Sequence, residues 1–133
     1  MSAESEIDPD GPAAAIALAF NDAITQRDID ALGRLMTDDH VFIDSDENPL
    51  SGKEEVLGAW KGFFTAFPDY RNVWTEVLPS DDTVIALGHS VCASEPALDG
   101  PAIWTANVRA NRVSAWRVYE DIPENRTLLG LAG

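Results

Sequence analysis

The spacing of hydrophobic and polar positions changes once along the chain, from helical in the first half to alternating in the second. Pro12 suits the first turn of a helix, and apolar residues then recur at helical spacing through Ile24. Asp28 is a candidate cap for a second short helix. The stretch Ser51-Gly52-Lys53-Glu54 has the form of a capping box that opens a third helix, which we expect to end at Pro68.

Alternating segments predict strands. The first lies between the second and third helices, and the segment after it, Ser45 to Leu50, reads as a loop or a short edge strand. Turn-forming residues at Ser80-Asp81-Asp82 and Ala110-Asn111 predict two hairpins. Pro123 begins a short turn or helix. The expected strands are Val41 to Asp44, Tyr70 to Leu78, Thr83 to Ala93, Ala102 to Arg109 and Val113 to Asp121.

Three helices followed by a run of strands indicate an α+β fold, with the helices packed on one side of a curved antiparallel sheet. If the sheet curls, helices and sheet enclose a conical cavity. The aperiodic, acidic segment 1–11 is expected to be a disordered tail, and 12–133 to be a single domain.

Composition narrows the classes of partner. The net charge of −14 disfavours nucleic acid and anionic membranes. No apolar run has the length of a membrane span and no signal-peptide pattern is present, so we expect a cytoplasmic protein. The lone Cys92 excludes an internal disulfide and is expected to be buried. Two scattered histidines predict no metal site, and the lack of phosphate or dinucleotide motifs predicts no cofactor.

Two acids end apolar strands, and a carboxylate in that position can serve acid–base chemistry at a pocket. Asp44 either lies in the pocket or begins a solvated acidic loop. Asp121 either lies in the pocket, caps the C-terminal turn or pairs with an arginine. It shares a strand face with Arg117 and Tyr119, which is either a pocket wall or an outer surface. His40, beside two aspartates, is expected to be an exposed turn residue.

Several segments together resemble the SnoaL-like branch of the nuclear transport factor 2-like superfamily. The resemblance spans roughly Ala13 to Leu131 and implies a cone-shaped fold with a pocket for a small hydrophobic organic ligand. It also implies a homodimer that pairs through the outer sheet face. The segments that carry it are Arg27 to Leu32, Leu35 to Asp39, Ser51 to Val56, Phe67 to Tyr70 and Trp116 to Asp121.

The superfamily includes enzymes whose catalytic residues can be compared with the residues at the matching positions of this chain. Asp44 fits the general base of ketosteroid isomerases, but Phe20 and Trp104 stand where the oxyanion-hole donors would be, which argues against that chemistry. Asp121 matches the last-strand acid of limonene epoxide hydrolases, yet Gly88-His89-Ser90 replaces their Arg-x-Asp pair. SnoaL-type polyketide cyclases need only one acid–base residue in a hydrophobic pocket, which Asp121 or Asp44 would supply.

The resulting hypothesis is a pocket protein that performs cofactor-independent isomerisation or cyclisation, with Asp121 as the primary proton-transfer residue and Asp44 as the second. The alternative is a non-catalytic ligand-binding or dimerisation module, favoured by the missing donors at Phe20 and Gly88. The expected pocket residues are Phe20, Trp60, Phe63, Phe64, Tyr70, Trp74, His89, Trp104 and Tyr119.

Overall fold

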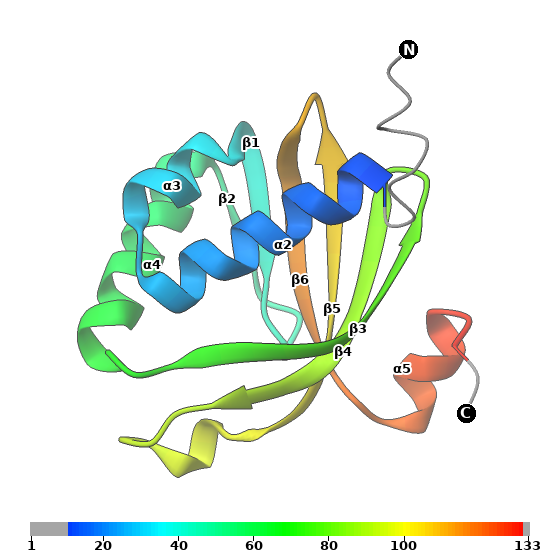
Figure 1. Ribbon diagram of the computed structural model, residues 1–133. Helices are drawn as coiled ribbons and strands as arrows, with labels where there is room; N and C mark the ends of the chain where they lie inside the picture. The colour runs from blue at the N-terminus through cyan, green and yellow to red at the C-terminus, as the bar shows by residue number, and fades with distance from the viewer. Residues whose placement is uncertain (1–10, 132–133) are drawn as a thin grey trace.

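The computed structural model describes residues 11–131. Three helices lie on one face of a curled sheet and a short fourth helix follows the last strand (Figure 1). The predicted tail lies outside the described residues, except for Gly11, which begins the first of these helices. The helices are α2 (Gly11–Gln26), α3 (Ile29–Arg34), α4 (Lys53–Ala66) and α5 (Pro123–Leu128).

The helix boundaries follow local chemistry in most places. The Asp28 side chain accepts a hydrogen bond from the Ala31 N–H at 3.1 Å and caps α3, as predicted. The capping box predicted for α4 is wrong. Its N-cap is Gly52, at φ +98°, and no side chain bonds to the end of the helix. Glycine adopts this backbone conformation without strain, so it starts α4 in place of a serine cap.

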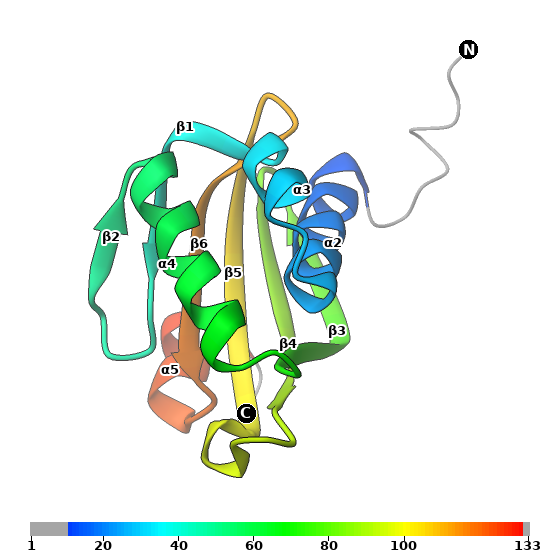
Figure 2. The same ribbon diagram turned by 90° about the vertical axis from the view of Figure 1, so that its left-hand side faces the viewer.

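The described residues form one six-stranded sheet in the order β2-β1-β6-β5-β4-β3 (Figure 2). The α+β class with a curved sheet is confirmed. The sheet is mixed, however, because β6 enters between β5 and β1 and runs parallel to β1. The alternation of apolar and polar residues along a strand does not indicate whether it runs parallel or antiparallel to a strand that is distant in the sequence. The strands are β1 (Met36–Ile43), β2 (Pro49–Ser51), β3 (Arg71–Ser80), β4 (Thr83–Val91), β5 (Gly100–Arg109) and β6 (Arg112–Glu120), with a 3-10 turn, η1 (Pro96–Leu98), before β5.

Both hairpin turns lie where they were predicted. Asp81 connects β3 to β4 at φ +55°, and Ala110 and Asn111 connect β5 to β6 at φ +52° and +64°. Two consecutive residues with positive φ match the right-handed twist of the adjoining strands. Cys92 is fully buried, as expected.

His40 departs from the prediction of an exposed turn residue. It lies inside β1, is fully buried, and its Nδ1 is 2.7 Å from the Val113 carbonyl oxygen of β6. Its ring stacks on Phe20 with centroids 5.6 Å apart. The neighbouring aspartates are exposed, but they belong to an irregular part of the β1–β6 pairing rather than to a turn. Only this long-range pairing places the imidazole in the core.

We expect His40 to make folding sensitive to mild acid. Burial lowers the pKa of His40 in the folded protein, so the unfolded chain binds the proton more readily. Stability is therefore highest above the ordinary histidine pKa and falls as pH decreases through about 6.5, until the folded form also becomes protonated. Urea unfolding at pH 8 and pH 5.5 measures this loss.

Two variants separate the effect of His40 from that of other titrating groups. His40→Gln should reduce the dependence of unfolding free energy on pH in this window, whereas His89→Gln, at an exposed position, should retain it. An unchanged pH dependence in His40→Gln would show that the buried imidazole is not the cause.

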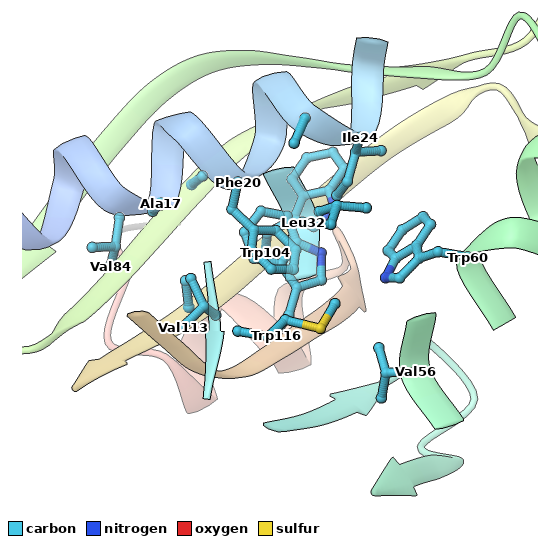
Figure 3. Close-up of a cluster of buried hydrophobic side chains, with 14 of the residues drawn as sticks. Ala17, Phe20, Ile24, Leu32, Val56, Trp60, Val84, Trp104, Val113 and Trp116 are labelled. Carbon is cyan, nitrogen blue, oxygen red and sulfur yellow. The ribbon is translucent and has the colours of Figure 1, made fainter. Parts of the chain in front are cut away.

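The hydrophobic core lies between the helices and the concave face of the sheet. Trp116 of β6 is fully buried, stacks on Trp74 at 5.5 Å, and contacts Phe20 of α2 at 4.5 Å. Figure 3 shows Phe20, Trp104 and Trp116 grouped together, with Trp60 of α4 standing apart from them. None of the described helices is both long and apolar enough to span a membrane.

Candidate functional site

A cavity of about 610 Å³ lies between α4 and the inner face of the sheet. Its volume falls within the range of small-molecule sites. Aromatic rings from α4, β5 and β6 form much of its wall, and the loop before β5 closes one side. The lining residues are Phe42, Asp44, Ser45, Val56, Ala59, Trp60, Phe63, Tyr70, Asn72, Ser90, Ala97, Leu98, Asp99, Gly100, Pro101, Ala102, Trp104, Trp116, Val118, Tyr119 and Glu120.

The part of β6 that lines the cavity includes one of the two C-terminal acids. Trp116, Val118, Tyr119 and Glu120 of this strand line the cavity. Glu120 is exposed and pairs in register with Ala102 of β5, which also lines it. Asp121 is one residue further on and does not line it. The acid of this strand that borders the cavity is therefore Glu120.

Asp121 is held in an ion pair outside the cavity. Its two carboxylate oxygens accept hydrogen bonds from Arg126 Nε at 2.6 Å and Arg126 Nη2 at 2.9 Å. This bidentate contact lowers the pKa of Asp121. Both residues lie along a second hollow with His89 and Thr75. Of the three alternatives for Asp121, the structure shows the pair with an arginine. This pairing keeps the carboxylate ionised and is typical of a structural role rather than of proton transfer.

Asp44 lines the cavity, but its carboxylate also holds a loop. Oδ1 accepts hydrogen bonds from the Asp46 and Asn48 N–H groups, both at 2.9 Å, and Oδ2 accepts one from Asn48 Nδ2 at 3.4 Å. Asp44 therefore lies at the cavity and also begins the acidic loop, which were the two alternatives considered for it. Asp44 and Asp121 do not line a common cavity.

The inner part of the cavity contains polar groups that do not titrate near neutral pH. Burial raises the pKa of the Tyr70 hydroxyl to about 12, so it stays protonated. Asn72 donates from its amide nitrogen to Asn21 Oδ1 at 3.1 Å, which leaves its own buried Oδ1 without a partner. The buried Trp116 indole nitrogen also has no partner. Tyr70, Asn72 and Trp116 all line the cavity, and none of their side chains transfers a proton near neutral pH.

The predicted pocket residues separate into two groups. Trp60, Phe63, Tyr70, Trp104 and Tyr119 line the cavity, although the Tyr119 ring also lies beneath the Arg117 guanidinium at 4.5 Å. The other four do not line it. Phe20 and Phe64 are buried in the core, Trp74 stacks on Trp116, and His89 is exposed beside the second hollow.

Sequence reasoning missed Asn72, Asp99 and Glu120 as lining residues. Asn72 follows Arg71 at the start of β3, where a polar residue reads as the end of a loop. Asp99 lies in the loop before β5, and its Oδ1 accepts a hydrogen bond from the Cys92 N–H at 2.6 Å. Strict alternation from Trp116 would have found Glu120, had Trp116 been recognised as inward-facing.

Comparison with known proteins connects this geometry to a family. The family model for the SnoaL-like domain matches residues 17–121, which include both sides of the cavity. The chain belongs to the SnoaL-like family. The resemblance stated from the sequence is thereby confirmed. No curated protein sequence matches this SnoaL-like chain.

Solved structures share the fold of this SnoaL-like protein at low sequence identity. A candidate SnoaL-like polyketide cyclase from Shewanella putrefaciens CN-32 is 16% identical, with TM-score 0.75, over 97% of this chain and 92% of its own. A protein with a ketosteroid isomerase-like fold from Catenulispora acidiphila, in complex with trimethylamine, is 21% identical, with TM-score 0.65, over 88% of this chain and 93% of its own. TerC, co-crystallised with polyporic acid, is 15% identical, with TM-score 0.71, over 90% of this chain and 99% of its own.

Proposed function

We propose that this SnoaL-like protein binds a small organic molecule with an apolar, ring-containing body in the cavity between α4 and β6. The observation that carries the proposal is the aromatic wall. Phe42, Phe63 and Tyr70 are each half-buried and line an open volume of about 610 Å³. Aromatic faces with a few placed polar groups are the usual composition of a ligand site. Two structural neighbours hold small organic molecules, trimethylamine and polyporic acid.

Cofactor-independent acid–base chemistry, such as isomerisation or cyclisation, is the second candidate function. The observation that favours it is Asp44, a carboxylate on the cavity wall. Against it, the Asp44 oxygens already accept bonds from the loop, and Asp121, the primary acid of the two-acid hypothesis, does not line the cavity. Ligand binding is the function that the geometry supports best. We further propose a homodimer through the outer sheet face and a cytoplasmic location.

A substitution that narrows the cavity tests the binding function. Ala59 lines it from α4, so Ala59→Phe should weaken binding of a neutral bicyclic probe, naphthol, by about ten-fold, which corresponds to about 1.4 kcal/mol. Calorimetric titration measures the affinity. Ala66→Phe, on the same helix but outside the lining, is the matched control and should bind like the wild type.

Asp121→Asn provides a second control, because Asp121 lies outside the cavity. Equal naphthol affinity in Ala59→Phe and in the wild type would contradict the assignment of this cavity as the binding site.

A further inference from the structure

All charged side chains that line the cavity are carboxylates. They are Asp44 at the end of β1, Asp99 before β5, and Glu120 at the end of β6. Among the described residues, no lysine, arginine or histidine lines it. The whole chain carries a net charge of −14, so the surrounding field has the same sign. An anionic ligand would be repelled from this cavity, and a cation would be attracted to it.

The nearby arginines do not neutralise these acids. Arg27 donates to the backbone carbonyl oxygens of Thr25 and Tyr70, at 2.5 and 3.1 Å. Arg117 lies over the Tyr119 ring and is 3.8 Å from Glu47. Arg126 is paired with Asp121. Among the described residues, no arginine therefore forms an ion pair with Asp44, Asp99 or Glu120.

The aromatic wall is also suited to a positive charge. Indole and phenol rings present negative faces, and cations are attracted to them, most strongly to tryptophan. The rings of Trp60, Trp104 and Tyr70 line the same volume as the three carboxylates. An apolar body and a cationic group can therefore be accommodated together.

We propose that the ligand of this cavity is a cationic amine with an apolar ring system. The ring packs on the aromatic wall, and the ammonium lies toward Asp44, Asp99 and Glu120. This inference rests on the proposed binding function and adds the charge class of the ligand.

Three phenols of similar shape test the charge preference. Tyramine is a cation, para-ethylphenol is neutral, and para-hydroxyphenylpropanoate is an anion. We expect tyramine to bind at least about five-fold more tightly than para-ethylphenol, and the anion to bind most weakly. The preference should shrink at high salt. The tryptophan indole N–H signals in NMR spectra report the site, because Trp60, Trp104 and Trp116 line the cavity and Trp74 does not.

Charge-removing variants assign the preference to named residues. Asp44→Asn and Glu120→Gln should each weaken tyramine binding by about three-fold more than they change para-ethylphenol binding. Asparagine at position 44 can still accept hydrogen bonds from the loop. Asp81→Asn, in the β3–β4 turn, changes the net charge equally and is the matched control, because asparagine tolerates the φ of +55° found there.

The outcomes distinguish the two proposals. If naphthol and all three phenols leave the indole signals unchanged, the binding function fails and the charge inference fails with it. If naphthol binds but para-ethylphenol or the anion binds as tightly as tyramine, the charge inference alone is overturned. The same conclusion follows if Asp81→Asn weakens tyramine binding as much as the two cavity variants.

Discussion

Gly88→Ala is expected to destabilise the protein by about 3 kcal/mol or to prevent folding altogether. A Cβ atom at position 88 would lie 2.0 Å from the Val73 carbonyl oxygen and 2.9 Å from Trp74 Cα. Both are backbone atoms of β3, so neither can rotate away. Gly88 pairs with Trp74 next to the register irregularity between Trp74 and Glu76, where β3 approaches β4 closely. Urea unfolding measures the effect.

A second glycine provides the control for this prediction. Gly62 lies within α4, and a Cβ there would meet nothing within 4 Å. Gly62→Ala should therefore stabilise the protein, by about 0.5–1 kcal/mol, because alanine loses less backbone entropy in a helix. If Gly88→Ala were as stable as the wild type, the close approach of β3 to β4 would not be the reason for glycine at this position.

Trp116→Ala is expected to cost about 3–5 kcal/mol of stability and to remove naphthol binding. Trp116 is fully buried, stacks on Trp74, contacts Phe20 and lines the cavity. Its removal joins a new void to the cavity and takes away part of the binding wall. Unfolding midpoints and calorimetric titration of naphthol measure the two effects.

Trp116→Phe separates packing from hydrogen bonding. The phenyl ring retains most of the contact with Phe20 and Trp74 but lacks the indole N–H, which has no protein partner to lose. We expect a stability loss well below that of the alanine variant. Equal losses in the two variants would mean that aromatic packing at this position contributes little.

Much of the fold could be predicted from local chemistry. The helical spacing before Pro68, the Asp28 cap and the two hairpin turns depend on residues close together in the chain, and each lies where it was expected. The α4 cap was mistaken because Gly52 provides the required φ without a side-chain bond. The parallel β1–β6 pair was missed because those strands are distant in sequence.

The residues of the candidate site could be predicted only in part, because the site is formed by elements that are distant in the sequence. Trp60 and Trp104 were predicted as pocket residues because large aromatic residues in a small α+β domain face inward, and both line the cavity. Trp74 was expected there too, but it stacks on Trp116 in the core. Which buried rings pack together and which border an open volume depends on how far α4 stands from the sheet.

By itself, the sequence determined the α+β class, the position of most elements, the aromatic character of the cavity and the surplus of negative charge. Only the tertiary structure decided that Glu120 borders the cavity while Asp121 pairs with Arg126 of α5. The tertiary structure likewise placed His40 in the core through its pairing with Val113. Local residue patterns encode the period of an element, whereas the direction of each side chain depends on partners that folding brings together.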